Sequence, residues 1–332
     1  MTKYPRETCI DPPLESKMFK SRCERNDNCL STVTIVNDLD SNMIGRNELV
    51  KELWNDHRVL VFTNRGHYIM DYDDKKKEYT PRGKKEASKQ TKKLKPKYPI
   101  LPDYIPDPNR CALEHGIHAY KLDRFVDDLE RVLDEHGVEK TDLVGSSLGG
   151  LVSQAFAARH PERVERLALM KTFSSISPPI KTALRDIPKI GWTFMNWFGK
   201  ARSKMIKEKD YGDYLPETVL QAIAQGIGDI DMTPYQKKID PKKTETYIIR
   251  CPDDITWGTP VKNIKDAREE VLLFCGHVFN TRNPEMYDHI EDFLKEGREK
   301  TNRYPKEEQL PSIDLPQCDI DHPDSCEMPI VE

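Results

Sequence analysis

The chain has 332 residues, of which 37% are hydrophobic and 33% charged, and its formal net charge is −4. Its mean hydropathy of −0.72 is low for an enzyme. The negative balance argues against a nucleic-acid-binding protein, because such proteins neutralise phosphates with Lys and Arg. The length accommodates one large domain with extensions or two smaller ones. The chain has no apolar run of the kind found in a signal peptide or a membrane span, so we expect neither, and we expect a cytoplasmic location.

Two β-branched segments begin the regular part of the chain. Residues 32–36 (TVTIV) and 58–62 (RVLVF) predict strands, and the amphipathic residues 47–54 between them predict a helix. Residues 1–30 show no evident strand. We expect them to form a partly disordered N-terminal extension.

A polar insertion follows over residues 70–112. Residues 73–97 hold eleven Lys or Arg against four acidic residues, and a proline-rich stretch comes next. Such a segment could dock on an anionic membrane or on nucleic acid. Its lysines, however, form no helical stripe and are not interleaved with aromatic residues. A flexible, solvated insertion is therefore the favoured interpretation, and contact with a membrane surface is unsupported.

The middle of the chain alternates between helix and strand signals. Apolar residues at helical spacing predict a helix over 122–136, and Gly137 is a suitable stop. Residues 141–144 predict a strand, 151–159 an alanine-rich helix and 164–170 another strand. This succession is typical of a parallel α/β sheet.

A serine lies at the turn between this strand and this helix. Gly145-Ser146-Ser147-Leu148-Gly149 has the G-x-S-x-G spacing of a nucleophile elbow. A sharp turn exposes the serine hydroxyl to a base, and glycines on both sides leave room for the tight backbone. The amide of Leu148, at the helix N-terminus, would point at a developing oxyanion. The plainer alternative is a glycine-rich turn in any parallel sheet.

The stretch GVEKTDLVGSSLGGLVSQAFAARHPERVERLALM resembles the central segment of the α/β-hydrolase superfamily. The resemblance continues more weakly over residues 31–67 and 245–295. It implies an α/β fold, with a mostly parallel α/β-hydrolase sheet flanked by helices and an inserted helical lid. We accordingly expect the hydrolase domain over 31–296, the lid over 175–243 and a disordered tail over 297–332.

The resemblance also implies a chain order of Ser, then Asp or Glu, then His. The predicted strand 246–250 ends before Cys251-Pro-Asp-Asp, where Asp254 fits the acid position best and Asp253 is the alternative. A helix-like stretch over 261–269 and a strand over 271–275 lead to Gly276-His277, the family's position for the catalytic histidine. A helix over 285–294 completes the domain. Taken alone, a histidine after a strand is usually structural, and an Asp pair is usually a solvated turn.

The loop after the first predicted strand departs from the family. Where the family has His-Gly, this chain has Asn37-Asp38-Leu39-Asp40. Leu39 is the best candidate for the second oxyanion amide. Asp38 or Asp40 would place negative charge near an oxyanion, which argues against full activity. Arg65-Gly66-His67, after the second strand, is similar to the family's Arg-Gly-His turn.

The expected lid contains a cluster of aromatic residues, Trp192, Phe194 and Trp197, and a second helical pattern over 216–227. Two interpretations remain open. The aromatic side chains line an acyl pocket above Ser147, or they attach the lid to the core.

Eight cysteines are scattered along the chain without a zinc-binding spacing. We expect Cys251 and Cys275 to be buried free thiols. The cysteines near the termini leave an oxidising compartment open.

Together these features predict a serine hydrolase that cleaves a carboxylic ester or a related small acyl compound. Ser147 would be the nucleophile, His277 the base and Asp254 the acid, and neither a metal nor an organic cofactor is required.

The main alternative is a non-catalytic binding or scaffold protein on the same fold. The run GSSLGG…TFSS is similar to the maspardin branch of the superfamily, which is associated with partner binding. A C–C bond hydrolase or a haloalkane-type enzyme is disfavoured, the latter because the elbow carries Ser rather than Asp. The sequence assigns no oligomeric state.

Overall fold

The computed structural model describes residues 14, 16–19, 21, 23, 29–39, 47–66, 70–73, 78–81, 112, 115–178, 181, 217–252, 258–273, 275 and 284–298. The chain divides into two compact units. The first comprises Met1–His67 and Ile100–Asn302, and the second comprises Tyr68–Pro99 and Arg303–Glu332.

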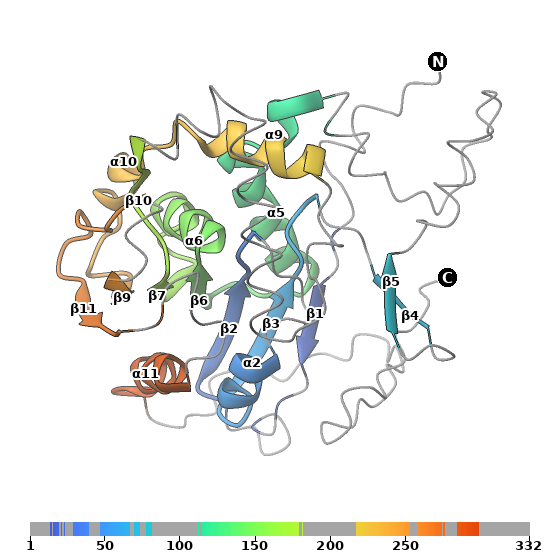
Figure 1. Cartoon of the computed structure of the whole chain (residues 1–332). Coiled ribbons are helices and arrows are strands. Elements are labelled where there is room, and N and C mark those ends of the chain that lie inside the picture. Colours follow the sequence, from blue (N-terminus) through green and yellow to red (C-terminus); the bar gives the residue numbers. More distant parts are fainter. Residues whose placement is uncertain are drawn as a thin grey trace. The chain divides into compact units, whose positions relative to one another are not determined.

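A seven-stranded sheet forms the centre of the first unit, in the order β1-β3-β2-β6-β7-β9-β11 (Figure 1). The strands are β1 (Ser16–Phe19), β2 (Ser31–Val36), β3 (His57–Phe62), β6 (Thr141–Ser146), β7 (Val164–Met170), β9 (Glu245–Arg250) and β11 (Arg268–Val271). All neighbouring pairs are parallel except β1 and β3. The predicted mostly parallel α/β sheet is confirmed.

The edge strand β1 was not evident from the sequence. Its four residues pair antiparallel with β3, from Ser16 opposite Phe62 to Phe19 opposite Val59. Four half-buried residues give too short a pattern to indicate a strand without its partner. The sheet therefore extends into the segment expected to be an N-terminal extension.

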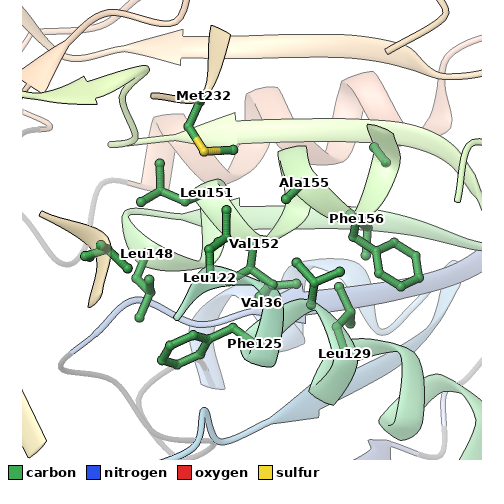
Figure 2. Close-up of a cluster of buried hydrophobic side chains, with 14 of the residues drawn as sticks. Val36, Leu122, Phe125, Leu129, Leu148, Leu151, Val152, Ala155, Phe156 and Met232 are labelled. Carbon is green, nitrogen blue, oxygen red and sulfur yellow. The ribbon is translucent and has the colours of Figure 1, made fainter. Parts of the chain in front are cut away.

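Side chains alternate between two buried clusters on opposite faces of the sheet. On β6, Leu143 belongs to one cluster and Val144 to the other, as the two-residue period of a strand requires. Residues of α5 (Leu122–Glu135), α6 (Leu148–Arg159) and α9 (Glu217–Ile227) cover the first face. Residues of α2 (Asn47–Leu53) and α11 (Pro284–Lys295) cover the second. Figure 2 shows the first cluster, with Phe125 and Leu129 of α5 beside Val152 and Phe156 of α6.

The helices and strands predicted between residues 122 and 170 are confirmed, but the prediction between β9 and β11 is wrong. Residues 261–267 form no helix, and β11 begins at Arg268, three residues before the predicted start of that strand. Asp266 has φ 57°, in the left-handed region that a helix cannot continue through. The described residues of the apolar run after it are only partly buried. Leu272 and Cys275 are buried, whereas Val271 and Leu273 are exposed.

The described part of the expected lid packs on the core. The helix α9 confirms the pattern over 216–227, and α10 (Thr233–Gln236) follows it in the chain. The strand β8 (Ser175–Ile176) begins the region and pairs antiparallel with β10 (Gly258–Thr259). Val219, Ile223 and Met232 are fully buried in the first cluster, which also contains Leu148.

In the second unit, β4 (Met70–Asp73) and β5 (Glu78–Pro81) form an antiparallel hairpin inside the predicted flexible insertion. Within the described part of the chain, no helix has the length and apolar character needed to cross a bilayer.

Two disulfides correct the prediction of free thiols. Cys251 and Cys275 are buried as expected, but they are bonded to each other, with a Cα–Cα distance of 5.3 Å. Cys23 and Cys29 form a second bond. The first bond joins the chain just after β9 to the chain just after β11. Because disulfides are rare in the reducing cytosol, these bonds argue against the cytoplasmic location expected from the sequence.

Loss of the Cys251–Cys275 bond should lower the free energy of unfolding by about 3 kcal/mol, because the bond closes a long loop. The two cysteines are 24 residues apart, whereas Cys23 and Cys29 are 6 apart. Urea titration of the Cys251→Ser/Cys275→Ser variant measures the loss. The Cys23→Ser/Cys29→Ser variant is the matched control and should lose roughly 1 kcal/mol less. Equal stability of wild type and the first variant would show that the bond does not constrain the unfolded chain.

Candidate active site

Ser147 occupies a strained turn between β6 and α6. Its backbone angles are φ 52° and ψ −118°, and it is the N-cap of α6. Positive φ is uncommon outside glycine and costs on the order of 1–3 kcal/mol, so the surrounding structure must enforce it. This is the backbone geometry that the G-x-S-x-G pattern predicts.

The flanking glycines allow close contacts that a side chain would block. A Cβ atom at Gly145 would lie 2.6 Å from the Ser153 hydroxyl and 2.7 Å from the Gly149 carbonyl oxygen. A Cβ atom at Gly149 would overlap the carbonyl oxygen of Val36 and lie 2.6 Å from that of Asn37. The first turn of α6 therefore rests directly on the backbone that follows β2.

Backbone bonds fix the elbow on both sides of the serine. The Ser147 amide donates to the Met170 carbonyl at the end of β7 (3.2 Å). The Ser147 carbonyl accepts from the Thr172 hydroxyl (2.9 Å) and from the amides of Gly150 (3.0 Å) and Leu151 (3.3 Å). The strained residue is thus held by the next strand and by its own helix.

The two adjacent serines have different surroundings. Ser146 is 1% exposed, and its hydroxyl donates to Oδ2 of Asp38 at 3.2 Å. Ser147 is half-buried and retains access to solvent. Of the two serines, Ser147 is the one partly exposed to solvent.

The predicted oxyanion residues lie at the same carboxyl edge of the sheet. Leu148 begins α6, and its side chain is buried in the first cluster, as Figure 2 shows. Leu39 lies in a turn after β2, half-buried against that cluster. Between β2 and Leu39, Asn37 and Asp38 are both buried.

Other predicted site residues lie outside the described residues. These are the acid Asp254 and its alternative Asp253, the base His277, Asp40 and His67, and the lid aromatics Trp192, Phe194 and Trp197. Their roles remain predictions. The described residues contain no group of three or more His, Cys, Asp or Glu side chains able to hold a metal ion.

A buried ion pair, which the sequence did not indicate, anchors the turn after β3. The Arg65 guanidinium binds the Asp128 carboxylate of α5 through Nε (2.6 Å) and Nη2 (2.7 Å), and its Nη1 donates to the Ala119 carbonyl (2.8 Å). Both side chains are almost inaccessible. Such bidentate pairs fix geometry as well as charge. The Arg-Gly turn noted in the sequence is therefore fastened to the helix that covers the first face.

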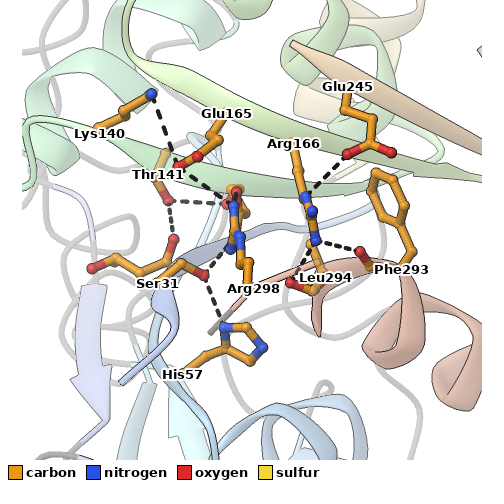
Figure 3. Close-up of polar contacts among 12 residues, drawn as sticks. Ser31, His57, Lys140, Thr141, Glu165, Arg166, Glu245, Phe293, Leu294 and Arg298 are labelled. Atoms are coloured by element: carbon orange, nitrogen blue, oxygen red, sulfur yellow. Dashed lines mark hydrogen bonds and ion pairs between the residues drawn. The ribbon is translucent and has the colours of Figure 1, made fainter. Parts of the chain in front are cut away.

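Ser31, His57 and Asp142 form a polar group at the amino ends of the strands, and Figure 3 labels Ser31 and His57. The Ser31 hydroxyl contacts His57 Nδ1 (2.8 Å) and donates to Asp142 Oδ2 (2.5 Å). The serine, and not the histidine, is the central member, and all three are buried. Ser147 is five residues after Asp142, which is roughly 16 Å along β6 at about 3.3 Å per residue. This group therefore cannot serve as the base for Ser147, and its order does not suit nucleophilic catalysis.

Comparison with protein families identifies the class. Residues 85–299, more than half of the chain, match the model of the alpha/beta hydrolase fold family. The chain belongs to this family.

Curated relatives match mainly in short segments. The chain is 48% identical over 83 residues to a 2-hydroxymuconate semialdehyde hydrolase of Pseudomonas sp. (strain CF600), which is 25% of this chain and 28% of that protein. It is 26% identical over 237 residues to a cis-3-alkyl-4-alkyloxetan-2-one decarboxylase of Shewanella oneidensis, covering 59% and 73%. The first of these matches spans little more than a quarter of the relative's length.

Solved structures share the fold over most of the chain. An enol-lactonase from Burkholderia xenovorans LB400 superposes with a TM-score of 0.58 at 19% identity, covering 85% of this chain and 96% of that one. The esterase EaEST from Exiguobacterium antarcticum gives 0.56 at 14% identity, covering 86% and 96%. At these identities the likeness concerns the fold alone.

Proposed function

We propose that the protein is a serine hydrolase that cleaves a carboxylic ester or a related small acyl compound through an acyl-enzyme on Ser147. The observation that carries the proposal is the backbone of Ser147, held at φ 52° at the turn between β6 and α6. A strained, solvent-accessible serine between two close-packed glycines serves nucleophilic attack and has no evident structural purpose. Relatives named as hydrolases support the same class.

The proposed reaction has two steps. The Ser147 hydroxyl attacks the substrate carbonyl while His277 takes its proton, and Asp254 orients the imidazole and stabilises its charge. The amides of Leu148 and Leu39 bind the oxyanion of the tetrahedral intermediate. His277 returns the proton to the departing alcohol, which leaves the acyl group on Ser147. Water, deprotonated by His277, then releases the acid and restores the serine.

A fluorophosphonate probe tests the nucleophile. We expect the wild-type protein to be phosphonylated on Ser147 with one equivalent of probe, because only an activated serine displaces fluoride at an appreciable rate. Ser147→Ala should abolish labelling with little loss of stability. Ser146→Ala retains Ser147 and should still carry the label, located by peptide mass spectrometry. Labelling on Ser146, or its absence from folded wild-type protein, would contradict the proposal.

A second candidate is a binding or scaffold protein on the same fold. Asn37 and Asp38 stand where the family has His-Gly, and this departure at the oxyanion loop favours it. The probe separates the two functions. A folded, non-catalytic protein would remain unlabelled, whereas an enzyme would be labelled on Ser147.

A further inference from the structure

The loop that follows β2 is shaped by side-chain hydrogen bonds. Asn37 is inaccessible, and its Nδ2 donates to the Phe62 carbonyl at the end of β3 (2.8 Å). Asn64 Nδ2 in turn donates to the carbonyl oxygens of Asn37 (2.7 Å) and Asp38 (3.4 Å). These bonds attach the backbone on both sides of Asp38 to the chain that leaves β3.

Asp38 attaches the same loop to the nucleophile elbow. Its Oδ2 accepts a hydrogen bond from the Ser146 hydroxyl, directly before Ser147 (3.2 Å). The backbone of Val36 and Asn37 also lies against Gly149. The loop therefore contacts the elbow at the residue before the nucleophile and at the second residue after it.

We propose that Asp38 is a positioning residue, whose hydrogen bond from Ser146 sets the Leu39 amide relative to Ser147. This rests on the proposed serine hydrolase function. Oxyanion donors act at well-defined distances, so a loop with one anchor fewer binds the transition state less well while substrate binding changes little. The Asp38 carboxylate would then hold the loop as a hydrogen-bond acceptor, and catalysis would not depend on its negative charge.

A positioning role for Asp38 predicts a different change in rate from an electrostatic effect of its negative charge on the oxyanion. A carboxylate facing the oxyanion would slow the reaction, and its removal would accelerate it. An acceptor that holds the loop gives the opposite result. Asparagine distinguishes the two because its side-chain oxygen still accepts from Ser146 but carries no charge.

The test is a double-mutant cycle on p-nitrophenyl acetate hydrolysis, with kcat normalised to active sites titrated by fluorophosphonate. Asp38→Ala and Ser146→Ala should each lower kcat about tenfold, well below the loss seen when an oxyanion donor is deleted, and leave KM within about twofold. The double variant should be no slower than the slower single variant, because the bond between Ser146 and Asp38 is already lost in both. Asp38→Asn should retain most of the wild-type kcat. Thr141→Val, at the other end of β6 and bonded to Thr34 (2.8 Å), is the control and should keep kcat per titrated site.

Three outcomes would overturn the inference while wild type is still labelled. They are a double variant whose loss is the product of the single losses, an Asp38→Asn variant as slow as Asp38→Ala, and any Asp38 variant faster than wild type. A folded wild-type protein that is neither labelled nor active would instead overturn the proposed function, and the inference with it. Normalisation to titrated sites keeps the comparison valid if a variant folds only in part.

Discussion

Replacement of His277 by glutamine should lower kcat for p-nitrophenyl acetate by about four orders of magnitude or more. The hydroxyl of Ser147 is a weak nucleophile while it keeps its proton, and glutamine has no site that can take one. The fluorophosphonate reaction should slow in parallel, because it needs the same activation. The residual rate would reflect the oxyanion amides alone.

A matched histidine separates a lost base from a general effect of the substitution. His118 is exposed on the short helix η3 (Gly116–Ala119), and His118→Gln should retain kcat within about twofold. Steady-state hydrolysis and probe labelling of both variants are the measurements. If His277→Gln were as active as His118→Gln, His277 would have no part in the mechanism, and the base would have to be sought elsewhere.

The second large effect concerns stability in acid, through His57. This side chain is inaccessible, and its Nε2 has no hydrogen-bond partner among the residues that the structure describes. Burial, reinforced by the positive charge of Arg298, lowers the pKa of His57 to about 3. Lys295 and Arg166 act in the same direction as Arg298, and Asp56 opposes them. The native protein therefore keeps His57 neutral where the unfolded chain protonates it.

The sign of the effect follows from proton binding. Above pH 6.5, the usual pKa of histidine, both states leave His57 neutral and it contributes no pH dependence. Between about pH 6.5 and 3 only the unfolded state binds the proton, so stability falls by up to about 1.4 kcal/mol per pH unit as the pH decreases. Below the folded pKa the contribution levels off.

Urea unfolding at pH 7 and pH 5 measures this contribution. The wild-type protein should lose roughly 2 kcal/mol more between the two values than His57→Gln, which cannot bind the proton. All other titrating groups are shared and cancel in the comparison. Glutamine can still contact Ser31, and only the difference between the two pH values is used, so a loss of stability common to both does not affect the result. The same pH dependence in both proteins would show that His57 is protonated in the native state.

Local sequence patterns were sufficient for most of the core elements. The helix α5, the strand β7 and the turn at Ser147 follow from residues close in sequence: an apolar stripe, an apolar run and glycines at fixed spacing. The family resemblance supplied the order of the site residues. Where the pattern was short or weak, as at β1 and at residues 261–269, it failed. A strand of four residues depends on its partner, and an amphipathic stretch need not form a helix.

The sequence by itself determined the central strands of the sheet, its covering helices and the position of the elbow serine, because each is encoded by neighbouring residues. Only the tertiary structure decided the contacts between distant residues. Asp38 and Ser146 are 108 positions apart, Arg65 and Asp128 are 63 apart, and Cys251 and Cys275 are 24 apart. Nothing in the local pattern of either partner specifies such a pair, since it exists only when the fold brings the two segments together. The loop after β2 illustrates this, because the same Asp38 that argued against activity in the sequence is bonded to the elbow in the fold.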